Sequence, residues 1–380
     1  MIYFDNSATT QPYPDVLKTY QEVASKIVGN PSSLHQLGTQ SMRILKASRR
    51  QIAELLGKAE DEIIFTSGGT EGDNWVLKGL AFEKSCYGRH IIVSHIEHPA
   101  VKETAKWLAE QGFEVDFAPV SQSGFVDVEA LSRLIKDETI LVSVMAVNNE
   151  IGSIQPIAEI SQLLENKPTI SFHVDAVQAI GKIAPEAYLT DRVDFATFSG
   201  HKFHAVRGVG FVYKKAGKKI APLLHGGGQE SRFRSGTENA AGIAAMAKAL
   251  RLIFDKEEKA RKELLTMKKA LLAGLSNYND VTIFSGLENF APHILTFGIK
   301  DVRGEILVHA FEEHDIYIST TSACSSKAGK PAGTLIAMGI SQKLSQTAVR
   351  VSLDETNDMG QIEQFLTIFQ HIYNKTKKVR

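Results

Sequence analysis

Short apolar runs that alternate with amphipathic helical segments are the feature that most constrains how this chain can fold. Each run is short enough for a single strand, and the segments between the runs have helical spacing of apolar residues. Unbroken apolar strands of this kind are typical of a mostly parallel sheet that is covered by helices on both faces. Such sheets bind ligands at the carboxyl ends of their strands, so we expect functional residues just after the runs. The seven runs span 62–66, 90–94, 113–120, 139–147, 170–177, 194–199 and 209–213.

The domain organisation follows from the length and from a change in pattern. A chain of 380 residues is long enough for one large domain and a smaller one. An Ala- and Lys-rich helical stretch from 239 to about 277 is suited to connect them, and mixed helix and strand patterns follow it. We therefore predict an α/β fold with a seven-stranded, mostly parallel sheet in a large domain over residues 15–255. Residues 1–14 and 256–380 are expected to form a smaller α+β domain.

Composition narrows the class of protein. Lys plus Arg and Asp plus Glu both number 43, and a net charge of zero gives no support for binding nucleic acid or an acidic membrane. The chain has two cysteines, Cys86 and Cys324, which cannot form a disulfide framework or supply a zinc or iron–sulfur site unaided. No signal peptide or spanning apolar run is visible. We expect a cytoplasmic protein without a metal site.

Three strand ends carry residue types that together suit one organic cofactor. Gly68 and Gly69 lie between a strand and a helix, where a phosphate could approach the backbone. Asp175 and Lys202 each follow an apolar strand. Taken singly, these residues could be a structural turn, a helix N-cap and a surface lysine. Together they supply a phosphate cradle, an acid for a ring nitrogen and an amine for an aldehyde, which is what pyridoxal 5'-phosphate (PLP) requires.

The two cysteines have different sequence surroundings. Cys86 lies in a helical segment before an apolar strand, which favours a buried, inert thiol. Cys324 lies among Ser, Thr, Gly and Ala, with Lys327 and Lys330 close by, which favours an exposed loop. Nearby lysines stabilise the thiolate, which is the nucleophilic form of cysteine. Cys324 is therefore the candidate nucleophile.

Ten short motifs in register resemble the cysteine desulfurase family (NifS/IscS-like) of class V aminotransferases, which are fold-type I PLP enzymes. They cover the chain from residue 3 to about residue 354. The resemblance implies conversion of L-cysteine to L-alanine, with the sulfur held on Cys324 as a persulfide. The motifs are FDNSATTQP, GNPSSLHQLG, SGGTEGDN, EHPAV, VNNEIG, HVDAVQA, SGHKFH, HGGGQESRFRSGT, SACSS and AVRVSL.

The resemblance also implies a role for each matching residue. Lys202 would be the Schiff-base lysine, Asp175 would pair with the pyridine nitrogen, and His98 would stack on the ring and move protons. Arg350 would clamp the substrate carboxylate with its guanidinium. Thr237 would reach the cofactor phosphate of the partner subunit in a homodimer. Hydrogen bonds to the phosphate, the ring oxygen or the substrate are implied for Gly69, Thr70, Ser199, His201, Asn149 and Gln178.

Other functions stay open from the sequence. A selenocysteine lyase or an aminotransferase of the same fold would share the PLP residues, although a plain aminotransferase has no use for Cys324. A non-catalytic binding relative is a further alternative, but such a relative is expected to lose one of the key residues. The chain ends at HIYNKTKKVR, short of the tail with which housekeeping members dock an iron–sulfur scaffold. An acceptor protein for tRNA thiolation therefore competes with an iron–sulfur scaffold as the sulfur acceptor.

Overall fold

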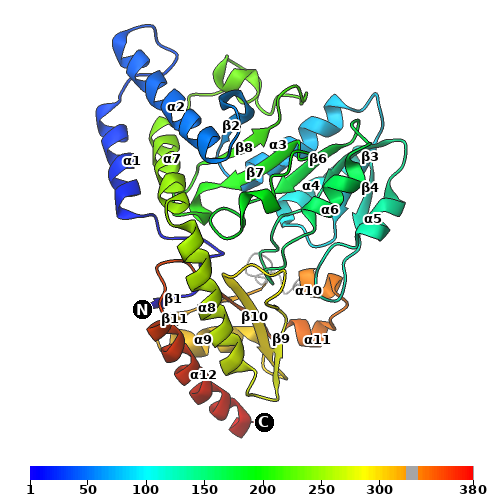
Figure 1. The fold of residues 1–380 in the computed structure, drawn as a ribbon, viewed down its shortest axis with the longest axis vertical. Helices are drawn as coiled ribbons and strands as arrows, with labels where there is room; N and C mark the ends of the chain where they lie inside the picture. The colour runs from blue at the N-terminus through cyan, green and yellow to red at the C-terminus, as the bar shows by residue number, and fades with distance from the viewer. Residues whose placement is uncertain (322–332, 380) are drawn as a thin grey trace.

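A seven-stranded sheet dominates the computed structural model, which describes residues 1–321 and 333–379 (Figure 1). Its strands are β2 (Ile63–Thr66), β3 (His90–Ser94), β4 (Glu114–Ala118), β5 (Thr139–Ser143), β6 (Ser171–Asp175), β7 (Phe195–Ser199) and β8 (Gly210–Lys214). Their order is β2-β8-β7-β6-β5-β3-β4. The neighbours from β7 to β4 are parallel, whereas β8 runs antiparallel to both β2 and β7. The predicted mostly parallel α/β sheet is confirmed.

Helices cover both faces of this sheet, because successive strand residues point to opposite faces. Strand residues on one face, such as Phe172, pack with α5, α6 and α7 in one apolar core. Strand residues on the opposite face, such as Leu141, pack with α3 and α4 in another. Helices α1 and α2 contact α7 at the outer side of the first core (Figure 1). These helices are α1 (Pro14–Lys26), α2 (Gln36–Leu55), α3 (Gly69–Glu83), α4 (Pro99–Glu110), α5 (Val128–Leu134), α6 (Ile157–Leu164) and α7 (Ala240–Phe254).

A smaller four-stranded sheet has its own core. Its strands are β9 (Val281–Ile283), β10 (Ile294–Ile299), β12 (Ser319–Thr320) and β13 (Ala348–Ser352), antiparallel in the order β12-β13-β10-β9. Phe297, Phe365 and Leu271 are among the buried residues of this core. This is the smaller α+β unit that we expect, while the domain boundaries given above stay a prediction. Its helices are α8 (Glu257–Leu275), α9 (Gly304–Glu312), α10 (Gly333–Ala337), α11 (Gln342–Ser345) and α12 (Met359–Val379).

The N-terminal segment lies against the smaller unit. Strand β1 (Ile2–Tyr3) pairs in parallel with β11 (Ile316–Tyr317). Asn6 Nδ2 then donates to Ser352 O at 3.2 Å, and the Ser7 amide donates to Ser352 Oγ at 2.9 Å. Because Ser352 ends β13, the first residues of the chain are fixed beside one of the last strands. None of the described helices is long and apolar enough to cross a membrane.

The helical stretch expected over 239–277 is confirmed, whereas the expectation for Cys86 was wrong. The stretch consists of two helices, because Lys256 has φ −126° and interrupts them. The interruption lets α7 pack on the core of the large sheet and α8 on that of the small sheet, as Figure 1 shows. Cys86 is exposed rather than buried, because α3 ends before it and the chain makes turns there.

Candidate active site

A cavity lies at the carboxyl ends of β6 and β7, where Asp175 and Ser199 end their strands. Arg350 on β13 lines the same cavity, so both sheets contribute to it. This is the position at which the parallel sheet was expected to bind a ligand. The predicted site residues that line the cavity are Gly69, Thr70, His98, Asn149, Asp175, Gln178, Ser199, His201, Lys202 and Arg350.

The N-terminus of α3 lies at the cavity, where it suits an anion. Gly68 has φ 152°, a conformation that favours glycine. A Cβ on Gly69 would lie 2.8 Å from Val177 Cγ2, so a larger residue would push the turn away from Val177. Free amide groups at a helix N-terminus attract anions. The nearby Glu71 carboxylate is paired with Arg234 at 2.9 Å, which offsets its negative charge.

Two buried carboxyl groups lie at the floor of the cavity. Burial raises the pKa of Asp175 to about 6, although the Val177 amide and the charge of Lys202 oppose that shift. Asp175 Oδ1 accepts a hydrogen bond from Val177 N at 3.0 Å. Burial, with the charge of Asp175, raises the pKa of Asp73 well above its usual range. These two carboxyl groups favour a cationic group in the cavity. The alternative role of Asp175 as a helix N-cap is not observed, since a turn follows β6.

Lys202 is half-buried at the end of a short 3-10 turn, Gly200–Lys202, that follows β7. Its ammonium donates hydrogen bonds to Ser7 O at 2.6 Å and to Ala8 O at 2.9 Å. Lys202 is therefore not an ordinary solvated lysine: backbone carbonyls of the N-terminal segment hold its amine at the cavity. Gln178 Nε2 donates to the same Ser7 carbonyl at 3.0 Å, which fixes that segment from a second side.

His98 is both the cap of a helix and a lining residue of the cavity. It is the N-cap of α4, and its Nδ1 accepts a hydrogen bond from Ala100 N at 3.1 Å. Burial, together with the charge of Lys202, lowers the pKa of His98 to about 4. The imidazole is therefore neutral near pH 7, with its proton on Nε2 because Nδ1 is the acceptor.

Arg350 is buried and not part of a surface ion pair. Its guanidinium donates to Asn149 O at 2.7 Å and to Asp5 Oδ1 at 2.9 Å. Its Nε is buried without a hydrogen-bond partner among the described residues. A buried guanidinium with an unused donor, at the wall of the cavity, is suited to bind a carboxylate.

The phosphate candidates at the other wall are also ordered by neighbours. His201 Nδ1 lies 3.2 Å from Thr9 Oγ1. Burial, then the charges of Lys202 and Arg207, lowers the pKa of His201 to about 4, so its imidazole is neutral near pH 7.

Two predicted residues are not brought into the cavity lining. Thr237 is exposed and lies outside the lining residues. Its contact with a partner subunit stays a prediction. Cys324 lies outside the described residues. Thr321, three positions earlier in the chain, is described and lines the cavity.

The sequence reasoning missed several lining residues, among them Ser7, Ala8, Asp73 and Glu150. Asp73 could have been found, since it lies one helical turn after Gly69 and so shares its face of α3. Burial raises the pKa of Glu150 to about 7. Ser7 and Ala8 act through backbone carbonyls, for which the sequence carries no signal.

Comparison with known proteins defines the class of this fold and site. The family model for aminotransferase class-V matches residues 2–365. A solved structure titled "NIFS-LIKE PROTEIN" superposes with a TM-score of 0.92 at 38% identity, covering 98% of this chain and 99% of that one. The chain belongs to the class-V aminotransferase family.

Curated relatives place the chain within a narrower group of that family. It is 51% identical to a "NifS/IcsS protein homolog" of Lactobacillus delbrueckii subsp. bulgaricus, over 100% of this chain and 99% of the relative. It is 38% identical to "Cysteine desulfurase IscS" of Methanosarcina thermophila, over 100% of this chain and 93% of the relative. The chain is a NifS/IscS-like member, as the sequence motifs indicate.

The family depends on PLP, and the cavity fits that cofactor. The α3 N-terminus with its glycine turn suits a phosphate, and the buried Asp175 suits a protonated ring nitrogen. The amine of Lys202 is held at the same cavity, where it suits an aldehyde. The donor set therefore supports the expected cofactor.

Proposed function

We propose that this protein is a PLP-dependent cysteine desulfurase, which converts L-cysteine to L-alanine and transfers the sulfur to Cys324. The observation that supports the proposal most directly is the convergence of Lys202, Asp175 and Arg350 on one cavity. Lys202 and Asp175 suit PLP, and Arg350 suits the carboxylate of an amino acid. Relatives named cysteine desulfurase share this chain's full length.

When bound, the cofactor supplies an electron sink for chemistry at the amino-acid α-carbon. Asp175 would supply a negative charge to a protonated ring nitrogen, and Arg350 would orient the substrate through its carboxylate. The Lys202 amine, once it is uncharged and released by Ser7 O and Ala8 O, would take the α-proton. His98 can donate from Nε2, because its Nδ1 is occupied by the Ala100 amide.

Cys324 is the proposed sulfur acceptor within the chain. Its thiolate attacks the sulfur of L-cysteine, the substrate Cβ–S bond breaks, and an S–S bond forms. The electron pair of the broken bond stays with Cβ, which gains a proton and leaves as alanine.

The finer assignments concern partners and location. A homodimer in which Thr237 contacts the partner's cofactor phosphate follows from the family resemblance, and a cytoplasmic location follows from the low number of cysteines. For the acceptor, an iron–sulfur scaffold and a tRNA thiolation enzyme are the two candidates. A pull-down with each protein as bait distinguishes them, and binding to the scaffold alone would reject the tRNA route.

The two cysteines of the chain provide a matched experiment. Cys324→Ser is expected to lower alanine formation from L-cysteine by at least about 100-fold, because the nucleophile is lost. The exposed Cys86→Ser is the control and is expected to retain the parent rate. The measurement is alanine release, together with mass spectrometry of alkylated protein to locate the persulfide. Equal PLP absorbance in both variants shows that the site is intact.

Two outcomes would contradict the proposal. Normal alanine and sulfide release by Cys324→Ser would remove Cys324 from the mechanism. Alanine release from L-selenocysteine alone would identify a selenocysteine lyase, and amino-group transfer to a keto acid would identify an aminotransferase.

A further inference from the structure

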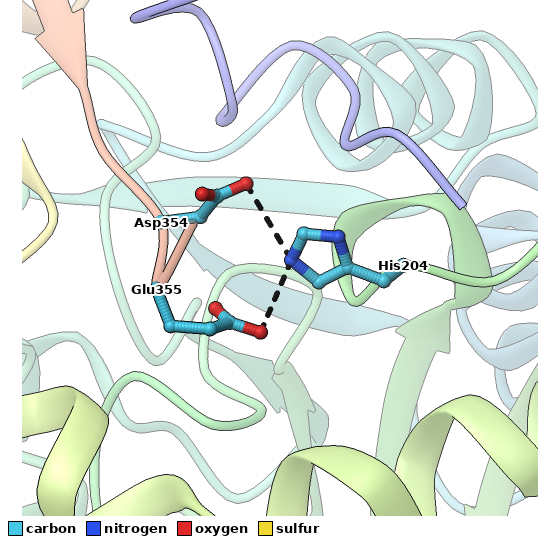
Figure 2. Close-up of side chains that lie close together, drawn as sticks. All are labelled: His204, Asp354 and Glu355. Atoms are coloured by element: carbon cyan, nitrogen blue, oxygen red, sulfur yellow. Dashed lines mark ion pairs between the residues drawn. The ribbon is translucent and has the colours of Figure 1, made fainter. Parts of the chain in front are cut away.

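A second cluster of buried ionisable side chains lies beside the loop that carries Lys202. Among the residues that the structure describes, His204, Asp354 and Glu355 form one group whose nitrogen and oxygen atoms lie within 4.8 Å of one another. Their side chains are 1%, 3% and 15% exposed. Figure 2 shows the imidazole of His204 facing both carboxylates. None of the three lines the catalytic cavity.

The tautomer of His204 leaves an acceptor atom pointing at the two acids. Its Nδ1 lies 2.8 Å from Gln11 O, and a carbonyl can only accept, so Nδ1 carries the proton. The lone pair of the neutral ring is then on Nε2, which is buried without a hydrogen-bond partner in the described chain. A lone pair that faces two carboxylates is repelled by them unless a proton or a metal cation lies between. The stacked ring of Tyr13, at 4.2 Å, holds the imidazole in this orientation.

The spacing suits a metal ion better than a proton. Nε2 lies 3.5 Å from Asp354 Oδ2 and 3.4 Å from Glu355 Oε1. Both distances exceed the range of about 2.7–3.2 Å for an N–H···O hydrogen bond. Two ligands that are each about 2.1 Å from a tetrahedral zinc ion lie about 3.4 Å apart. The two nitrogen–oxygen separations therefore match a shared ion, and the three candidate ligand atoms all lie within 4.8 Å of one another.

Each of the two carboxylates has one oxygen available to bind an ion beside His204 Nε2. Asp354 Oδ1 already accepts from Thr356 N at 2.8 Å and from Thr356 Oγ1 at 2.6 Å, which leaves Oδ2. Lys182 Nζ lies 3.5 Å from Glu355 Oε2, which leaves Oε1. Neighbours that fix the unused atoms of metal ligands are typical of metal sites. Glu355 also lines a surface pocket, together with Lys256, Lys259 and Glu263.

We propose that His204, Asp354 and Glu355 bind a divalent transition-metal cation of the zinc class. Nitrogen and carboxylate oxygen are both ligands that Zn²⁺ accepts, and three protein ligands leave a fourth position for water. The ion would tie the loop after Lys202 to the segment after Arg350. The site would therefore connect two parts of the catalytic machinery without contacting the substrate.

Equilibrium dialysis of the PLP-loaded protein against Zn²⁺ tests the proposal. Cys86 and Cys324 are first alkylated, since thiols bind zinc. The parent protein is expected to bind about one Zn²⁺ per chain. His204→Gln and Asp354→Asn are expected to weaken binding at least tenfold. Glu355→Gln, the least buried of the three, is the second variant to use if the others unfold.

A matched control comes from an exposed histidine–glutamate pair. His309 Nδ1 lies 3.1 Å from Glu312 Oε2 on α9, with side chains 75% and 55% exposed. His309→Gln is expected to bind Zn²⁺ like the parent. Zinc should raise the melting temperature of the parent and of this control, but not of the cluster variants. Failure of the parent to bind one zinc, or unchanged binding in His204→Gln and Glu355→Gln, would overturn the proposal.

Discussion

The catalytic cavity and the His204 cluster contain the same residue types but present opposite atoms to a ligand. In the cavity, His98 Nδ1 accepts from the Ala100 amide, so the proton is on Nε2. In the cluster, His204 Nδ1 donates to the Gln11 carbonyl, so the lone pair is on Nε2. The backbone group that meets Nδ1 therefore decides which atom each imidazole offers. The N–H of His98 can donate to an organic reactant, whereas the lone pair of His204 can bind a cation.

The aspartates of the two regions differ less than their histidines. Asp175 Oδ1 accepts from the amide two residues later, and Asp354 Oδ1 does the same. Each aspartate is thus held by the same local turn, with its second oxygen left for the site. What differs is the space in front of that oxygen: a cavity lined by many residues for Asp175, and one imidazole nitrogen for Asp354. The turn around each aspartate therefore does not distinguish the catalytic cavity from the His204 cluster.

Replacing an aspartate by asparagine in each region gives the largest expected difference in the rate of alanine formation. Asp175→Asn is expected to lower the rate of alanine formation by about 10²–10³-fold, because a charge that stabilises the reacting system is lost. Asp354→Asn, which does not touch the cavity, is expected to lower it by less than tenfold. Steady-state alanine release from L-cysteine measures both variants. Equal losses would show that the two regions do not act separately.

Arg350 allows a smaller test of the cavity alone. Arg350→Lys keeps the charge but loses the forked donor geometry that binds a carboxylate. Loss of one charge-assisted hydrogen bond, about 1.5–3 kcal/mol, raises the KM for L-cysteine by about 10–100-fold. The PLP absorbance should stay at the parent level. A parent-like KM would remove Arg350 from substrate binding.

Substitution of Glu97, which is adjacent to His98, is expected to give the smallest effect. That effect is a change in how the stability of the protein depends on pH. Its Oε1 accepts from Met145 N at 2.7 Å, and its Oε2 is buried without a partner among the described residues. Burial raises the pKa of Glu97 to about 8, whereas an unfolded glutamate titrates near about 4.3. The folded state therefore holds a proton that the unfolded state releases, so stability falls as pH rises between these values.

Glu97→Gln removes this titration and keeps the hydrogen-bond acceptor. We expect the melting temperature of the parent to fall by a few degrees relative to Glu97→Gln as the pH rises from about 5 to about 8. The exposed Glu103→Gln on α4 is the control and should follow the parent. Parallel pH profiles for the parent and Glu97→Gln would contradict the burial argument.

Much of the fold and the cavity could be predicted from the sequence, because strand ends are a local signal. The apolar runs before Asp175, Ser199 and Lys202 indicate where the sheet presents its side chains. The interruption between α7 and α8 could not be predicted, since it depends on which core each helix packs against. Nor could the carbonyls of Ser7 and Ala8, because backbone contacts leave no residue type to recognise.

The His204 cluster shows the same limit more clearly. His204 stands in a motif whose neighbour Lys202 accounts for the pattern, and Asp354 and Glu355 resemble ordinary surface acids in the sequence. Only the packing of β13 beside the N-terminal segment brings them together. The expectation of no metal site came from the two cysteines, and such a count does not consider histidines and acids that are distant in the sequence.

The contacts between the first residues and β13 also bear on how the protein is made. The N-terminal segment leaves the ribosome first, while its partners Arg350 and Ser352 are synthesised near the end. A growing chain therefore carries Lys202 long before it carries the arginine that we assign to the substrate. If Arg350 has the role proposed above, an unfinished chain would lack the group that binds the substrate carboxylate, and β13 would be the element that completes the site.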